Sequence, residues 1–173
     1  QGHMTENAER AMIARTLDHC AQLGVRPAGW LGPWISESHQ TPDLLQEAGF
    51  RYVLDWAHDD QPTRMATRSG TDILSIPYSQ EINDIPAIIA RNQEAATFAQ
   101  MIEDAVMQLL SECERRPLVL GIALHPYVMG QAHRALHLDR VLTRLREMDD
   151  PRIWWTTAGA IADHVASNNL ALG

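Results

Sequence analysis

Apolar residues recur every three or four positions in several long stretches of the chain, which is the spacing of an amphipathic helix. The first stretch starts after Thr5 and stops at Gly24, where a glycine with a left-handed backbone would end a helix. Two further stretches contain Phe98 and Leu138. The run "AGAIADHVASN" predicts a closing helix. We therefore expect four long helices.

Other apolar stretches lack this spacing and predict strands. The run "PLVLGIALH" shows no alternation at all, which is typical of a strand buried on both faces. Thr41 and Pro42 form an N-cap and first-turn pair, so a short helix should start there and end at Gly49. The other expected strands are a short extended segment in "RPAGW", then "FRYVLDW", "DILSIPY" and "RIWWTT".

Strands and helices alternate along the chain, which is typical of βα units with a parallel sheet. The right-handed crossover rule leaves two architectures, an open doubly wound sheet and a barrel. In both of them ligands bind at the carboxyl ends of the strands. The sequence thus predicts an α/β fold of about five parallel strands with flanking helices, and it predicts where a site should lie.

Composition narrows the range of functions. The chain has 173 residues, 45% of them hydrophobic, which suits one globular domain. Its net charge of −8 argues against nucleic acid or a membrane surface as partner and favours a neutral, cationic or hydrogen-bonding substrate. Gln1–His3 look like a remnant of cloning, so we expect a single domain over residues 4–173.

Two further observations concern the cellular compartment. Cys20 and Cys113 are far apart and lack the spacing of a disulfide framework or a zinc module, which favours reduced thiols in a cytoplasmic protein. No window reaches the ~18 apolar residues that a membrane helix needs. We expect a cytoplasmic protein.

Polar side chains stand at the carboxyl ends of the predicted strands. The pairs are Asp55 with Trp56, Tyr78 with Glu81, and His125 with Tyr127. A histidine in this position can transfer a proton near neutral pH, and a carboxylate at a neighbouring strand end can hold its tautomer. We expect Asp55 and His125 to form such a pair. The alternative is that His125 only caps its strand and hydrogen-bonds a backbone carbonyl.

Other polar and aromatic residues are weaker candidates. His133 and His137 have the i, i+4 spacing of a metal-binding pair, but a solvated helix surface is the more common setting for such a pair. Asp84 precedes Ile-Pro and is expected to cap a helix, although it could also contact a substrate. Trp30, Trp34 and Trp56 could stack on a flat substrate or could belong to the core.

The ordered segments "RPAGW", "YVLDW" and "GIALHPY" resemble the polysaccharide deacetylase family, specifically its allantoinase-like cytoplasmic branch. The stretch from Gly29 to Pro62 and the stretch "LGIALHPYVMGQAHR" are similar to parts of that branch. The resemblance implies a distorted (β/α) barrel and hydrolysis of a carbon–nitrogen bond in an amide-like substrate. The chain would form the C-terminal part of the barrel.

The resemblance also implies roles for individual residues. Arg26 matches the residue that orients the catalytic carboxylate, Asp55 the residue that supports the histidine, and His125 the general acid that protonates the leaving amine. A single aspartate stands where the family usually has two, which makes the match of Asp55 the weakest. The residues expected to contact the substrate are Trp30, Trp56, Tyr127 and Glu37.

The family's first two motifs, an Asp-Asp strand end and a His-x-x-x-His pair, have no match in this chain. The pair His133 and His137 has the spacing but follows the last motif, so it is not the missing pair. We therefore expect no metal site here, and a divalent metal only together with those motifs. The chain alone should be weakly active or inactive towards an amide, ureide or amino-sugar substrate.

Two alternatives remain open at this point. The chain could be a non-catalytic domain for small-molecule binding or for assembly that keeps the deacetylase fold. Part of a barrel also leaves sheet edges that another chain can cover, which favours a homodimer. A sheet of five strands with helical cover is the alternative to that dimer.

Overall fold

The computed structural model describes residues 1–114 and 116–168. The chain divides into two compact units. Unit 1 comprises Gln1–Pro77 together with the chain from Thr156 onward, and unit 2 comprises Tyr78–Trp155. The prediction of a single domain depends on how these units are joined, and it stays a prediction.

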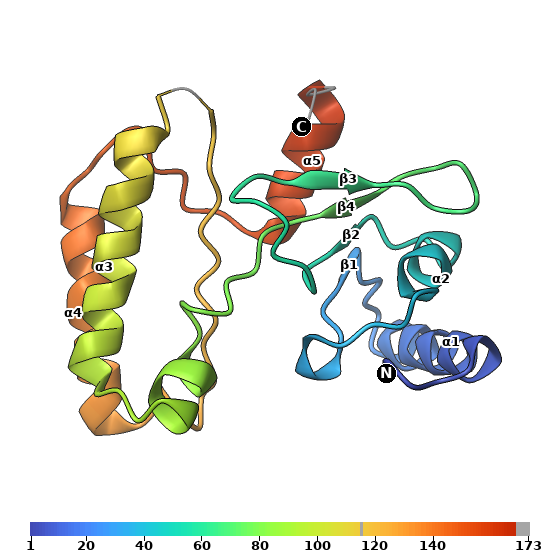
Figure 1. Ribbon diagram of the computed structural model, residues 1–173, viewed down its shortest axis with the longest axis horizontal. Coiled ribbons are helices and arrows are strands. Elements are labelled where there is room, and N and C mark those ends of the chain that lie inside the picture. The colour runs from blue at the N-terminus through green and yellow to red at the C-terminus, as the bar shows by residue number, and fades with distance from the viewer. Residues whose placement is uncertain (115, 169–173) are drawn as a thin grey trace. The chain divides into compact units, whose positions relative to one another are not determined.

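Unit 1 is built on a four-stranded mixed sheet (Figure 1). Strand β1 (Gly29–Trp30) pairs in parallel with β2 (Tyr52–Val53), and β2 pairs in parallel with β4 (Ile73–Ser75). Strand β3 (Thr63–Met65) pairs with β4 in the antiparallel direction and forms one edge. The carboxyl ends of the three parallel strands β1, β2 and β4 therefore lie on the same side of the sheet, which is where a site was expected.

The helices of unit 1 begin and end close to the predicted positions. Helix α1 spans Glu6–Gln22, and the Thr5 hydroxyl accepts a hydrogen bond from the third residue of its first turn. Gly24 has a φ of 72°, which confirms the left-handed glycine at its end. Helix α2 spans Thr41–Glu47 and packs against α1. Helix α5 spans Ala158–Asn168, the closing helix expected from sequence.

The short turn η1 (Pro33–Ile35) lies between β1 and α2 and is strained. Trp34 and Ile35 have φ values of 59° and 53°, a region that L-residues rarely adopt and that is least favourable for a β-branched side chain. Backbone hydrogen bonds from Ile35 to Gly32 and from Ser36 to Pro33 hold the turn. It leads directly into Glu37, one of the predicted site residues.

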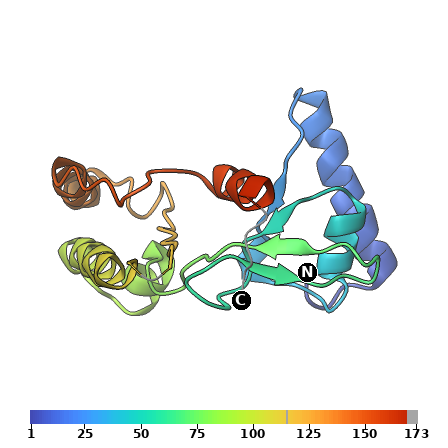
Figure 2. The same cartoon turned by 90° about the horizontal axis from the view of Figure 1, so that it is seen from above.

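Unit 2 is mainly helical. The short helical turn η2 (Ile85–Ala90) is followed by α3 (Ala95–Glu112) and α4 (Ala132–Glu147). Figures 1 and 2 show α3 and α4 side by side, and the two helices make the main contact of this unit. A parallel β-bridge joins Asn83 to Ala123 and brings the start of η2 next to the end of the predicted strand.

Each unit has its own hydrophobic core. In unit 1 the buried cluster consists of Ile13, Trp30, Leu44, Leu45, Phe50, Val53 and Ile73. In unit 2 it consists of Ile82, Ala87, Ile88, Phe98, Ala99, Ile102, Val128, Met129, Val141 and Leu145.

Several sequence-based expectations about the elements are wrong. Residues 117–125 form no extended strand beyond the bridge at Ala123, and most of them are only half-buried. A strand forms only where a neighbouring segment pairs with its backbone, and within the described ranges Asn83 supplies such a neighbour at a single point. Residues 152–157 form no strand. Strand β3 was not expected from the sequence.

Thr41 is the other local correction. It is the first residue of α2 and not its N-cap, which is Gln40. The Thr41 hydroxyl instead donates to Glu9, a fully buried carboxylate of α1, and accepts from the backbone N–H of Ser38. The side-chain amide of Gln1 also donates to Glu9 over 2.7 Å. Glu9 thus ties α1 to the start of α2.

Candidate active site

His125 is hydrogen-bonded to a buried carboxylate in unit 2. Its Nδ1 lies 2.6 Å from Asp84 Oδ1, and Asp84 is fully buried whereas the His125 side chain is 32% exposed. The other oxygen of Asp84 accepts the backbone N–H of His125 over 2.7 Å and that of Met129 over 3.3 Å. Three donors therefore converge on one carboxylate, and this His125–Asp84 dyad is rigidly held.

The dyad defines how His125 can act on a proton. An ionised carboxylate only accepts hydrogen bonds, so Nδ1 of His125 carries the hydrogen that lies between the two side chains. Nε2 is then the ring atom that is left to bind or release a proton. The Tyr127 ring meets the imidazole edge-on at a centroid distance of 5.7 Å. This is the geometry of a histidine oriented for general acid or base catalysis.

Two expectations are corrected by the dyad. The carboxylate that holds the tautomer of His125 is Asp84, the role that the sequence analysis gave to Asp55. Asp84 is the N-cap residue of η2, as expected, but its side chain makes no capping hydrogen bond. The alternative reading of His125, a bond from its ring to a backbone carbonyl, is replaced by the bond to Asp84.

Asp55 lies in unit 1, two residues beyond β2 and 6% exposed. Its Oδ1 accepts the backbone N–H of Gly32 over 2.7 Å, and its carboxyl group is hydrogen-bonded to that of Glu37. Glu37 Oε2 accepts the indole N–H of Trp56 over 2.7 Å. Two carboxyl groups and an indole therefore form a continuous chain at the carboxyl ends of β1 and β2. We call Glu37 and Asp55 the carboxyl pair.

The environment of the carboxyl pair favours a bound proton. Burial and the adjoining Asp55 carboxyl raise the pKa of Glu37 from its usual 4.5 to about 8, against the opposing effect of the Trp56 hydrogen bond. Burial also raises the pKa of Asp55, whereas its hydrogen bonds from Glu37 and from Gly32 act in the opposite direction. Near neutral pH the pair thus holds a proton, and Glu37 carries it.

A hollow of about 320 Å³ lies beside the carboxyl pair. Trp56, 42% exposed, forms part of its wall and stacks on His58 with a centroid distance of 5.6 Å and an angle of 11° between the rings. His58 Nδ1 is 3.2 Å from the Ser75 hydroxyl at the end of β4. The residues that line the hollow are Gly2, Glu37, Ser38, His39, Pro42, Trp56 and Met65.

Three other predicted site residues are placed as follows. Arg26 is exposed and precedes β1, and its guanidinium lies near Gly49. Gly49 precedes β2 and Asp55 follows it, and six residues of extended chain span on the order of 20 Å. The structure does not bring Arg26 to Asp55. Trp30 lies in the core of unit 1, edge-on to Phe50, and not on a pocket wall. Tyr127 is exposed beside His125.

The remaining candidates are on the surface. His133 and His137 both lie in α4, one turn apart as their spacing predicts. Within the described part of the chain, no three His, Cys, Asp or Glu side chains gather in a way that could hold a metal ion. Glu81 is exposed and pairs with Arg91 at 2.5 Å.

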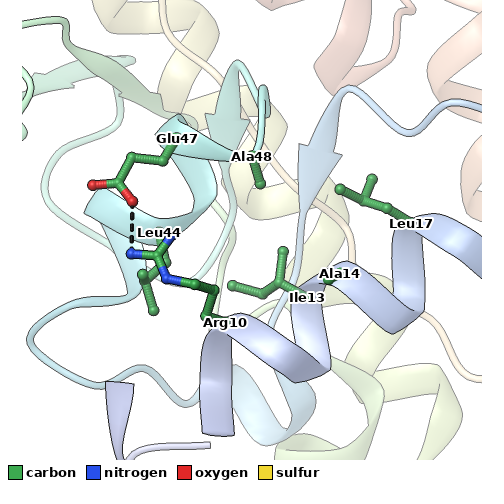
Figure 3. A pocket seen from close by; sticks show the side chains of 7 residues that line it. All are labelled: Arg10, Ile13, Ala14, Leu17, Leu44, Glu47 and Ala48. Carbon is green, nitrogen blue, oxygen red and sulfur yellow. Dashed lines mark ion pairs between the residues drawn. The ribbon is translucent and has the colours of Figure 1, made fainter. Parts of the chain in front are cut away.

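A second hollow, of about 230 Å³, separates α1 from α2 (Figure 3). Its wall is mostly aliphatic, and Arg10 and Glu47 form an ion pair of 2.8 Å across it. No predicted site residue lines this hollow, so it is a feature of helix packing and not part of the candidate site.

The fold and the sequence were compared with known proteins. No family model matches the chain. It is 21% identical over 197 residues to the peptidoglycan deacetylase of Helicobacter pylori, with 96% of this chain and 66% of that protein covered. Two solved structures match at 26% identity and a TM-score of 0.83, PuuE allantoinase and a probable polysaccharide deacetylase from Pseudomonas aeruginosa PAO1. The allantoinase match covers 95% of this chain and the deacetylase match 96%, and each covers 55% of the solved structure.

The chain has the fold of the polysaccharide deacetylase family. The predicted fold class and the resemblance read from "RPAGW", "YVLDW" and "GIALHPY" are confirmed by these matches. The chain spans between about half and two thirds of the length of the proteins it matches. None of the helices in the described ranges combines the length and the apolar character that a membrane span needs.

Sequence reasoning selected His125 but missed its partner. Asp84 and His125 are 41 positions apart, and they meet because the bridge between Asn83 and Ala123 aligns their two segments. The Asp-Ile-Pro sequence is typical of a helix start, so nothing in the sequence indicated that Asp84 would hydrogen-bond to His125. The pairing of Glu37 with Asp55 was missed for a similar reason, because it depends on the strained turn that follows β1.

Proposed function

We propose that this chain is part of a hydrolase of non-peptide carbon–nitrogen bonds, of the deacetylase and allantoinase type. The observation that carries the proposal is the His125–Asp84 dyad in a chain with a deacetylase-type fold. A proton donor with a fixed tautomer is what the departure of an amine from an amide requires. The substrate would be an amide, a ureide or an N-acylated amino sugar.

His125 would act as the general acid in this reaction. Water adds to the amide carbonyl carbon and gives one proton to a base, which would belong to the part of the matched proteins that this chain does not cover. The carbon–nitrogen bond of the resulting tetrahedral intermediate then breaks. The imidazolium of His125 donates its Nε2 proton to the leaving nitrogen, which departs as a neutral amine. Asp84 keeps Nδ1 protonated and stabilises the imidazolium before the transfer.

The test uses a longer protein. It contains this chain together with the region that the matched proteins have and this chain does not cover. Turnover of an amide and of a ureide is compared between the parent and its His125→Asn and Asp84→Asn variants. We expect each substitution to lower kcat by roughly 10²–10⁴, the usual contribution of a general acid or of its correct tautomer. His133→Asn is the matched control, because His133 is exposed on α4.

Full activity in His125→Asn would contradict the proposal. A parent protein that binds the amide or ureide without turnover would favour the other function class, a non-catalytic binding or assembly domain with the same fold. Equal losses in His133→Asn and His125→Asn would show that the dyad has no special part in the reaction.

We further propose a cytoplasmic homodimer that has neither nucleic acid nor a membrane as partner. Free Cys20 and Cys113 and the net charge of −8 support this setting. Residues 118–122 take no part in a strand or a bridge within the described part of the chain, which leaves backbone groups that a second copy could pair.

A further inference from the structure

Two buried carboxyl oxygens in unit 1 have no hydrogen-bond donor among the described residues. They are Oε1 of Glu37 and Oδ2 of Asp55. The other oxygen of each group is satisfied, Oε2 by the Trp56 indole and Oδ1 by the Gly32 N–H. Both unsatisfied oxygens belong to carboxyl groups that are hydrogen-bonded to one another.

A shared proton accounts for both of these oxygens. Two ionised carboxylates only accept hydrogen bonds, and their contact would place two like charges together in a site with little water. One proton turns the same contact into a donor and an acceptor.

We propose that Glu37 is a positioning residue, which shares one proton with Asp55 and thereby holds the indole of Trp56 in the wall of the neighbouring hollow. Gly32 fixes Asp55, Asp55 fixes Glu37 through the proton, and Glu37 fixes the indole N–H of Trp56. Without the proton, the Asp55 carboxylate repels the Glu37 carboxylate, and the Trp56 indole no longer has an acceptor in a fixed position. The inference concerns unit 1 alone and stands independently of the proposed hydrolase.

The backbone approaches Asp55 closely at Gly32. A Cβ at Gly32 would come within 3.1 Å of Asp55 Oδ2 and 2.6 Å of the Ser36 carbonyl oxygen. Gly32 therefore permits the close approach of the turn to Asp55. The turn places Glu37 against Asp55 at the cost of two left-handed residues, Trp34 and Ile35. Backbone strain of this kind persists where surrounding contacts impose it.

Other charged groups lie near the carboxyl pair and must be separated from it in any test. Glu9 of α1 is a further negative charge that disfavours ionisation of Glu37. His39 lines the same hollow, and His58 stacks on Trp56. Histidine side chains in general can change charge, so these two residues need their own control.

The experiment follows the indole N–H resonance of Trp56 in ¹H–¹⁵N spectra of the chain between about pH 6 and about pH 10. The resonance is assigned by its loss in Trp56→Phe. We expect it to move with a midpoint near the pKa of Glu37, about 8. In Glu37→Gln it should stay at its low-pH position throughout, because the amide donates to Asp55 and accepts from Trp56 without a titrating proton.

The Asp55→Asn variant gives the opposite result. Its amide can donate to an ionised Glu37, so the midpoint should fall below that of the parent. A midpoint that is unchanged in Glu37→Gln but lost in His39→Gln or in His58→Gln would overturn the proposal, since that histidine would then be the titrating group. A Trp56 resonance that does not move with pH in the parent would also overturn it. If Asp55→Asn does not fold, Glu37→Gln and His58→Gln decide the question.

Discussion

At the scale of single residues, the structure replaces one expected pair by two observed ones. Asp55 was expected to support His125, whereas Asp84 supports His125 and Glu37 supports Asp55. All four residues were singled out in the sequence, and their partners were not. A carboxylate is chemically suited to several partners, and only spatial proximity selects among them.

The carboxyl pair should make stability depend on pH in a defined direction. Folded Glu37 keeps its proton up to a pKa of about 8, whereas the unfolded side chain loses it near 4.5. Its contribution to stability is therefore fully present below about pH 4.5 and is lost as the pH rises through 8. One proton changes the free energy of unfolding by at most about 1.4 kcal/mol per pH unit, and partial exposure of Glu37 reduces this slope.

Thermal unfolding of the parent and of Glu37→Gln at several pH values measures this effect. We expect the variant to gain stability relative to the parent as the pH rises from 5 towards 8, since its amide bears no charge at any of these values. Parallel curves for the two proteins would contradict the expectation. Glu81→Gln is a suitable control, because Glu81 is an exposed carboxylate in unit 2.

At the scale of elements, helices were predicted better than strands. The 3.6-residue spacing identified α1, α3, α4 and α5 to within a few residues, because each helix forms its hydrogen bonds within its own segment. Strands need a partner segment. The run 117–125 and the run 152–157 have the composition of strands, yet in the described structure the first makes one bridge and the second makes none.

The contact of α3 with α4 should dominate the stability of unit 2. Phe98 is fully buried in that core, so Phe98→Ala should lower the free energy of unfolding by about 3–5 kcal/mol. Met107 lies on the same helix at 50% exposure, and Met107→Ala should change it by no more than about 0.5 kcal/mol. Urea unfolding of both variants checks the difference, and similar losses would show that α3 is not packed as described.

At the scale of the whole molecule, the chain has two separate cores and matches longer proteins. Each core is continuous within one unit, so each unit buries apolar side chains by its own contacts. The solved structures that it matches are covered to 55% of their length. Leu124 and Tyr127, on either side of His125 in the sequence, have exposed side chains.

The proposed homodimer is tested by light scattering. We expect a mass twice that of one chain at micromolar concentration, and a shift towards the monomer in Leu124→Glu, which adds a charge beside the single bridge of segment 117–125. Leu136→Glu is the matched control, because it adds the same charge at a side chain of similar exposure on α4. A monodisperse monomer for the parent would refute the dimer.

The sequence by itself determined the helices, the α/β class, the family resemblance and the choice of His125. These follow from local spacing, from the order of short motifs and from the position of a polar residue after an apolar run. Only the tertiary structure decided that Asp84 holds His125 and that Glu37 shares a contact with Asp55. Both pairings join residues far apart in the chain through a bridge or a strained turn, and such contacts leave no periodic pattern in the sequence.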